Sequence, residues 1–180
     1  MGQTPRAASS SWWYDLQQNL GGSFAAHAHG LLATKFALLN PDGEEFGRLR
    51  LSRVSGAEFQ SGNYTAAFEA SGRRYRMVVD DGEVLTASPK GRSIDELEIL
   101  CDGQTYEARV SFFRSLAVAS YPDGDRVVSL SGGLMGRNYD ALFAAENGCA
   151  LPVAVFLLWH VTTNRRRAYR AGTLTKGGAM

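Results

Sequence analysis

The feature that most constrains the fold is an uncharged apolar segment near the end of the chain. Residues 150–161 read ALPVAVFLLWHV, so a helix formed by them would be apolar on every side. Such a helix must be enclosed by protein or by lipid. At ~1.5 Å per residue the segment spans roughly 18 Å, which is less than the ~30 Å hydrocarbon core of a bilayer. We therefore predict a helix enclosed by the protein itself, with Pro152 in its first turn, where a missing N–H costs nothing.

Residues 23–145 are a succession of short stretches in which apolar and polar residues alternate. Leu97, Ile99 and Cys101, for example, alternate with charged or solvated positions, and turn residues separate one stretch from the next. Asp81-Gly82 and Asp102-Gly103 are hairpin signals. This period of two predicts about ten antiparallel strands, each with one apolar face.

A sheet with that many strands and a single apolar face folds into a sandwich or closes on itself. A closed barrel of ten or more strands is too wide for its own side chains to fill, and the apolar helix is the segment suited to its interior. We predict a mainly β fold, a closed antiparallel barrel of about ten to twelve strands around a buried hydrophobic C-terminal helix. The expected organisation is an N-terminal tail with a short helical turn (1–22), the barrel (23–163) with its central helix (150–163), and a basic C-terminal tail (164–180).

The N-terminal tail contains a short helical turn that Ser11 is suited to cap and that Gly21-Gly22 would end. Trp13, Leu16 and Leu20 would share one face of this turn. We expect that face to pack against the main body. The alternative is an aromatic anchor at a membrane surface, and no basic residues nearby favour it.

These features together resemble the tubby C-terminal-like superfamily, which includes the tubby, phospholipid-scramblase and LURP-one-related proteins. The resemblance covers roughly residues 23–161 and rests on the strand order, the Asp-Gly hairpins, the segment from Gly136 to Tyr139 and the terminal helix. It implies a barrel of about twelve antiparallel strands around a hydrophobic helix. It also implies binding of phosphoinositides or other membrane lipids, and sometimes of nucleic acid. The chain departs from the family pattern after the helix, and whether residues 167–173 add a final strand stays open.

The charge of the chain is unevenly distributed. All 18 acidic residues but only 14 of the 19 basic ones lie at or before Glu146, so the body carries −4 and the remainder +5. The basic residues of the tail are Arg165, Arg166, Arg167, Arg170 and Lys176. We expect this tail to contribute little to stability and to bind anionic lipid headgroups, at ~1 kcal/mol per charge. Nucleic acid is a weaker candidate, because Tyr169 is the only aromatic residue there for base stacking.

Further arginines alternate with apolar residues in the predicted strands and should stand on their outer faces. Arg48, Arg50 and Arg53 belong to one strand, and Arg74 and Arg76 to another. Solvated strand faces usually look like this, which is the alternative to a binding role. The candidate ligand-binding residues are Arg48, Arg50, Arg74, Arg76, Arg165, Arg166, Arg167 and Arg170.

The residues that commonly carry catalysis form no enzyme signature. His27 and His29 would point to the same face of a strand and could supply two metal ligands, but a third is needed and the one remaining histidine, His160, lies in the apolar helix. We expect the His160 ring to bond to a backbone carbonyl. Cys101 and Cys149 have no partner at a catalytic or metal-ligand spacing and are expected to pack in the core. No catalytic residue, metal or cofactor is therefore predicted.

The sequence favours a non-enzymatic binding or scaffold protein, with anionic lipid as the first candidate ligand and another protein as a further candidate partner. The alternatives are a small metal-dependent enzyme that uses His27 and His29, and a nucleic-acid-binding protein. The N-terminus lacks the apolar run of a signal peptide, two cysteines cannot form a disulfide framework, and no transmembrane segment is expected. The expected location is the cytoplasm, peripheral to a membrane where lipid is bound.

Overall fold

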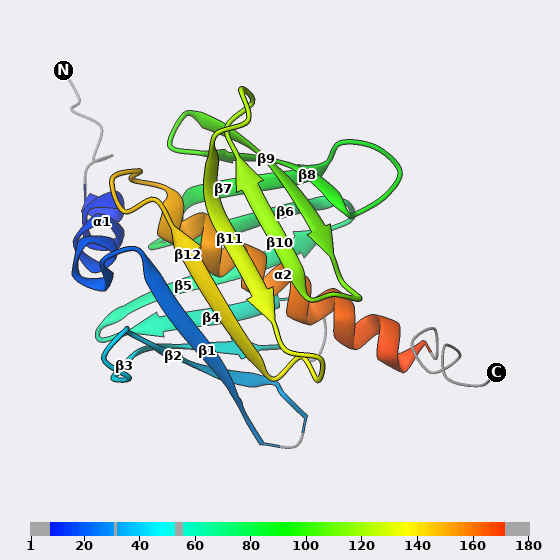
Figure 1. Ribbon diagram of the computed structural model, residues 1–180. Helices are drawn as coiled ribbons and strands as arrows, with labels where there is room; N and C mark the ends of the chain where they lie inside the picture. Colours follow the sequence, from blue (N-terminus) through cyan, green and yellow to red (C-terminus); the bar gives the residue numbers. More distant parts are fainter. Residues whose placement is uncertain (1–7, 31, 53–55, 172–180) are drawn as a thin grey trace.

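The protein is a closed barrel of twelve antiparallel strands with a long helix running through it (Figure 1). The computed structural model describes residues 8–30, 32–52 and 56–171. The fold class predicted from the alternating strands and the apolar helix is confirmed. Arg53 and Lys176, two of the basic residues considered above, lie outside the described residues.

The strands follow one another around the barrel in chain order, and the last pairs with the first to close it. They are β1 (Ser23–His29), β2 (Lys35–Leu39), β3 (Glu45–Leu51), β4 (Gly56–Ser61), β5 (Tyr64–Ser71), β6 (Arg74–Val79), β7 (Gly82–Pro89), β8 (Glu96–Cys101), β9 (Gln104–Ser111), β10 (Leu116–Ser120), β11 (Arg126–Gly132) and β12 (Asn138–Phe143). In β8 the side chains alternate strictly, with Leu97, Ile99 and Cys101 buried and their neighbours exposed. The period of two in the sequence is therefore the alternation between barrel interior and outer surface.

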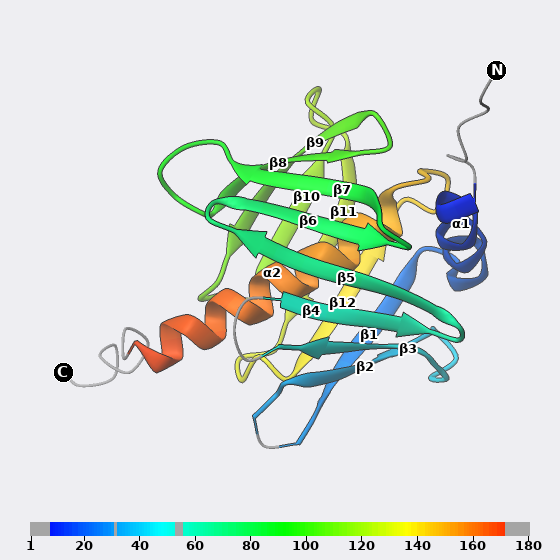
Figure 2. The same cartoon turned by 180° about the vertical axis from the view of Figure 1, so that it is seen from behind.

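The interior is filled by α2 (Ala150–Arg170), which passes through the barrel in both views (Figures 1 and 2). Every residue from Ala150 to Thr162 is buried. Aromatic side chains of the wall contact the helix directly: the ring centroids of Phe68 and Trp159 are 5.3 Å apart, and those of Tyr75 and Trp159 are 5.9 Å apart. The apolar circumference of α2 is thus matched by a complete apolar enclosure.

α2 differs from the prediction in its C-terminal end, because it continues beyond Thr163 to Arg170. The polar residues at this point bond back to the helix itself. The Thr162 hydroxyl donates to the Leu158 carbonyl at 2.7 Å, and the Asn164 amide donates to the His160 carbonyl at 2.8 Å. Arginine is a good helix former, so the helix continues through residues 165–170 and no strand forms at 167–170. Residues 172–180 of the predicted tail lie outside the described residues.

One end of the barrel is covered by α1 (Ala8–Leu20), which lies on the opposite side of the molecule from the C-terminal end of α2 (Figure 1). Trp13 is buried and stacks on Phe59 with ring centroids 5.2 Å apart, and Trp12 stacks on Tyr64 at 4.8 Å. These contacts confirm that the aromatic face packs against the body. The helix begins at Ala8, so Ser11 lies within it and is not its cap.

α1 also caps the first turn of α2. The buried Gln17 accepts a hydrogen bond from the backbone N–H of Leu151 at 2.8 Å and donates to the carbonyls of Ala145 and Asn147 at 2.7 and 2.5 Å. The first amides of a helix have no partner within it, and Cys149, at the N-cap position, makes no side-chain cap bond. Gln17 therefore links the N-terminal helix α1 to the first turn of the core helix α2.

Replacing Gln17 by alanine should destabilise the protein by about 1–3 kcal/mol, because buried backbone groups lose their partners. Urea unfolding of the variant and the parent measures this difference. Gln18→Ala is the matched control: the Gln18 amide donates to the same Ala145 carbonyl from an exposed position, and its loss should cost less than ~0.5 kcal/mol. Equal losses in the two variants would show that Gln17 is not a cap.

His160 lies in the middle of α2 and is almost completely buried. Its Nε2 is 3.2 Å from the carbonyl oxygen of Ile94, which confirms the expected bond to a backbone carbonyl. The Asn164 amide lies 3.3 Å from Nδ1, and donation by that amide together with an Nε2–H bond to Ile94 satisfies both ring nitrogens of the neutral form. Burial, with a smaller contribution from Arg167, lowers the pKa of His160 to about 4. The imidazole is thus neutral at pH 7.

The low pKa of His160 predicts acid destabilisation at a defined pH. The unfolded chain takes up the proton near the ordinary pKa of ~6.5, whereas the folded protein does so only near pH 4, so stability should fall between these values, by roughly 3 kcal/mol in total. Urea unfolding at pH 7.5, 5.5 and 4 measures the slope. His160→Gln should remove this component of the slope, and His27→Gln, at an exposed position, should keep it. If the free energy of unfolding of His160→Gln falls with pH as steeply as that of the parent, groups other than His160 cause the acid destabilisation.

Candidate anion-binding site at the open end of the barrel

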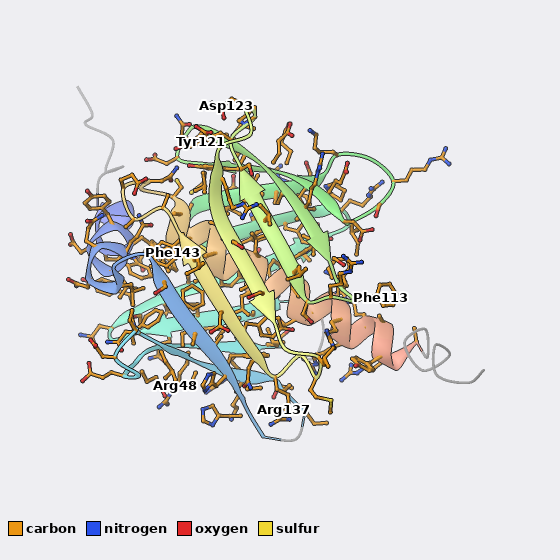
Figure 3. All side chains as sticks on the ribbon, viewed as in Figure 1. Arg48, Phe113, Tyr121, Asp123, Arg137 and Phe143 are labelled. Carbon is orange, nitrogen blue, oxygen red and sulfur yellow. The ribbon has the colours of Figure 1, made fainter. Side chains whose placement is uncertain are left out.

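The end of the barrel from which the C-terminal part of α2 emerges is not covered by α1, and we call it the mouth (Figure 2). The connections β1–β2, β9–β10 and β11–β12 are among those that lie at this end of the antiparallel barrel. Phe113 and Arg137, from the last two of these, lie beside the emerging helix, whereas Phe143 lies near α1 at the other end (Figure 3). The mouth therefore combines loops from distant parts of the sequence around the arginines of α2.

A cavity of about 330 Å³ opens at the mouth between α2 and two of these loops. Its lining includes four basic residues, Arg137, Arg165, Arg166 and Arg170. It also includes the apolar side chains of Leu32, Phe36 and Met135. No aspartate or glutamate is among the described residues that line it. The cavity is thus a concave surface with a strong excess of positive charge.

Arg165 is the buried member of this group, with a relative exposure of 6%. Its guanidinium donates to the Ser115 hydroxyl and to the Leu134 carbonyl, and it lies 5.6 Å from the centre of the Tyr169 ring. Its contacts are with neutral oxygens and this ring, and none of the ion pairs among the described residues includes it. Buried charges in proteins are usually paired, so Arg165 carries a charge that the described protein does not neutralise.

Gly136 explains why the sequence has no side chain beside this arginine. Its φ of +63° favours glycine, and a Cβ atom there would lie 2.8 Å from Arg165 Nε and 3.3 Å from the Tyr139 hydroxyl. The Arg165 side chain therefore passes directly beneath the loop. The segment from Gly136 to Tyr139, which contributes to the family resemblance, has a physical role at the mouth.

The remaining arginines of the mouth retain access to solvent. Arg137 donates to the Gly30 carbonyl at 3.0 Å, which joins the β11–β12 and β1–β2 loops. Arg166 is half-buried, and burial together with the neighbouring charge of Arg170 lowers its pKa. Cations are therefore crowded at this end of the barrel, and an anion placed among them would relieve their repulsion.

The arginines of the strands do not join this cluster. Arg48 pairs with Glu45, Arg74 lies 3.7 Å from Glu83, and Arg76 lies 2.5 Å from Glu69. Arg50 stands between Lys35 and Glu58 in the strand register. Of the eight predicted ligand-binding arginines, the structure gathers Arg165, Arg166 and Arg170 at one cavity, while Arg167 is exposed on the same helix.

A second hollow, of about 290 Å³, lies on the outer surface of β1–β4 and is lined by His29, Lys35, Arg48, Arg50, Glu45 and Glu58 among others. Its cations are accompanied by carboxylates, so it has little excess charge with which to hold an anion. Arg48 marks this face in Figure 3. His27 and His29 point outward on β1 as expected, but the described residues contain no group of three or more His, Cys, Asp or Glu placed to hold a metal ion.

Both cysteines are buried and lie apart from the two hollows. Cys101 is on the interior face of β8 with Leu97 and Ile99, as the alternation predicts. A hydrogen bond with the neighbouring Cys149 thiol, together with burial, raises the pKa of Cys101, so its thiol stays protonated. Cys101 is therefore a core side chain.

Comparison with known proteins supports the barrel fold but assigns the chain to no family. No family model and no curated protein matches the sequence. An X-ray structure of a protein from Arabidopsis thaliana is similar in fold, with a TM-score of 0.54 and 8% identity over 79% of this chain and 92% of that chain. At such low identity the likeness concerns the fold alone. None of the helices formed by the described residues has the length and apolarity needed to cross a bilayer.

The structure corrects the expectation that all residues after Thr163 contribute little to stability. Arg165→Gln should destabilise the protein by about 1–3 kcal/mol, because the shorter side chain leaves the Ser115 hydroxyl and the Leu134 carbonyl without their partner. Arg170→Gln, at an exposed position of the same helix, should change stability by less than ~0.5 kcal/mol. Urea and thermal unfolding of both variants test this difference, and equal midpoints would place Arg165 in a solvated tail after all.

Proposed function

We propose that this protein is a non-enzymatic, tubby-like lipid-binding protein that attaches peripherally to anionic membrane surfaces through its mouth. The observation that carries the proposal is that arginines with no carboxylate partner among the described residues lie beside strongly exposed apolar side chains at one end of the barrel. The family assignment adds support through the closed barrel with its enclosed helix. It remains part of the proposal, because the solved structure that resembles this chain is similar in fold alone.

The apolar side chains of the mouth are unusually exposed for their size. Leu32, Phe113, Leu134 and Met135 have relative exposures of 75, 71, 92 and 78%. They come from three of the connections at the mouth, β1–β2, β9–β10 and β11–β12, so they lie along one part of its rim. A cluster of exposed apolar side chains marks a surface that meets something other than water. A membrane interface suits both the apolar side chains and the arginines of the mouth, because acyl chains and phosphates lie within a few ångströms of each other there.

The two kinds of side chain are expected to act together. Each arginine near an anionic leaflet contributes ~1 kcal/mol, and this contribution weakens with salt because exposed charges are screened within ~8 Å at physiological ionic strength. Insertion of an exposed leucine or methionine adds up to ~1.5–3 kcal/mol each and is independent of salt. A combined surface therefore binds with a salt-sensitive and a salt-resistant component.

The alternative functions find less support. A nucleic acid would gain from aromatic side chains interleaved with the arginines, and Tyr169 is the one aromatic residue in the arginine-rich stretch 165–170 of α2. A metal-dependent enzyme would need a third ligand for His27 and His29, and none is placed for it among the described residues. If the partner is instead another protein, the purified chain should bind neither kind of vesicle.

The test is co-sedimentation with vesicles of phosphatidylcholine alone and with phosphatidylserine added, at low and at physiological salt. The variant Arg166→Gln/Arg167→Gln/Arg170→Gln should bind the anionic vesicles about a hundredfold more weakly at low salt, since three charges are removed at ~1 kcal/mol each. Arg165 is left in place to preserve folding. Leu134→Ser/Met135→Ser should lose the salt-resistant component.

The matched control is Arg48→Gln/Arg74→Gln/Arg76→Gln, which removes the same net charge from the ion-paired barrel wall. Its vesicle binding should stay within about threefold of the parent, because these arginines are ion-paired on the outer wall of the barrel and do not line the mouth cavity. If the control weakens binding as much as the mouth variant does, the protein is attracted to the vesicles by its overall charge and not through a defined binding surface. A parent protein that ignores anionic vesicles would remove the proposal.

A further inference from the structure

The mouth cavity has the mixed lining of a site for a single amphipathic molecule. Its volume of about 330 Å³ lies within the range of small-ligand pockets. Guanidinium groups line it together with the apolar side chains of Leu32, Phe36 and Met135. A flat basic surface that only adsorbs to a membrane needs neither the hollow nor its apolar wall.

Two polar atoms of the lining side chains lack hydrogen-bond partners although they are buried. They are the hydroxyl of Tyr139, a residue with 1% exposure, and Nε of Arg165, a residue with 6% exposure. An unsatisfied buried donor is costly and is rare in native structures. Both side chains line the cavity, but the two atoms themselves are covered, and the Tyr139 hydroxyl lies beside Ser115. A ligand oxygen that enters the cavity therefore reaches the hydroxyl only when the lining side chains shift.

The charge of the cavity selects among anionic groups. Four arginines line it and no carboxylate of the described residues does. A phosphomonoester carries about −1.5 to −2 at pH 7 and offers three acceptor oxygens, whereas a phosphodiester or a carboxylate offers a single charge. A phosphocholine group brings its own cation into the cluster. The phosphomonoester therefore neutralises the site most completely.

We infer that the mouth cavity binds the phosphomonoester head of one lipid molecule, with the adjoining part of an acyl chain against Leu32, Phe36 and Met135. This inference rests on the proposed function and makes it more specific, because a membrane-attached protein of this kind selects phosphatidate-like lipids from among other anionic ones. Arg165, held in place by Ser115 and Leu134, is the fixed charge of the site, and Arg166 and Arg170 close around the head from the solvent side.

The experiment uses the full chain and soluble ligands, without vesicles. Isothermal titration with dihexanoyl phosphatidate below its micelle concentration measures binding of head and chain together. Glycerol 3-phosphate and inorganic phosphate supply the head without the chain, and dihexanoyl phosphatidylcholine supplies the chain without the monoester. We expect the phosphatidate to bind at least tenfold more tightly than each of the other three.

Tyr139→Phe separates a binding role from a structural one. The hydroxyl lies beside Ser115 but makes no hydrogen bond of good geometry, so its removal should change the free energy of unfolding by less than ~1 kcal/mol, which is about fivefold in the unfolding equilibrium constant. The same variant should bind dihexanoyl phosphatidate about tenfold more weakly, because a hydrogen bond to a charged group is lost. Tyr64→Phe, at the α1 end of the barrel, is the control and should bind as the parent does.

A second readout is the pH dependence of binding. A phosphomonoester loses its second charge on protonation near pH ~6, so affinity for the phosphatidate should fall between pH 7.5 and 5.5. No histidine, aspartate or glutamate is among the described residues that line the cavity. The remaining groups there are arginines and tyrosines, which do not titrate in that range, and His160, buried in the barrel, is neutral throughout it. The change in affinity therefore reports on the ligand.

The outcomes separate this inference from the proposed function. Tight binding of the phosphatidate that weakens in Tyr139→Phe supports the inference. Equal binding of inorganic phosphate and phosphatidate overturns it, since the apolar wall would then contribute nothing and the site would hold an adventitious ion only. If the soluble phosphatidate fails to bind while anionic vesicles still do so through the mouth, the inference is overturned and the proposed function stands. Failure in both experiments overturns both.

Discussion

The enclosure of α2 by the barrel is the constraint on which the rest of the structure depends. A ring of twelve strands encloses more space than its own side chains fill, and a helix that is apolar all round needs a surrounding that excludes water. The helix therefore fills the interior of the barrel, and the barrel shields the helix from water. The ring contacts of Trp159 with Phe68 and Tyr75 are examples of this packing. The polar groups at the two ends of the barrel interior have their own partners. Gln17 accepts a hydrogen bond from a backbone N–H in the first turn of α2, and the side chains of Thr162 and Asn164 donate to carbonyls of the same helix near the mouth.

The position of the mouth follows from the same packing. α2 is one continuous helix, so the residues that fill the core also fix where the arginines after Asn164 stand. Arg165 is held by the hydroxyl of Ser115 and the carbonyl of Leu134 on two different connections of the barrel. The charges of the mouth are thus carried by the most deeply anchored element of the protein, and a ligand there would meet a largely preformed surface. Such preorganisation lowers the entropic cost of binding.

The sequence was sufficient to predict the barrel and its central helix, because both depend on local periodicity: alternation in stretches such as 97–101 and the unbroken apolar run of 150–161. It was not sufficient for the end of the helix, where Thr162 and Asn164 resemble a stop signal but hydrogen-bond within the helix. It also could not identify the mouth. Leu32 and Arg137 lie near each other because β1 pairs with β12, and Arg165 is buried because Gly136 admits it beneath a loop. These are consequences of barrel closure, which no short window of sequence contains.

The order of the elements along the chain has a consequence for how the protein is made. All twelve strands precede the helix that they enclose, and synthesis proceeds from the N-terminus. While the strands emerge, their apolar faces have no core to cover, and closure by β1 and β12 joins segments more than a hundred residues apart. Non-local closure of this kind is slow, and uncovered strand faces invite association with other chains. The strands of the nascent protein therefore lack their core until α2 has been synthesised, and association with other chains is most favoured during that interval.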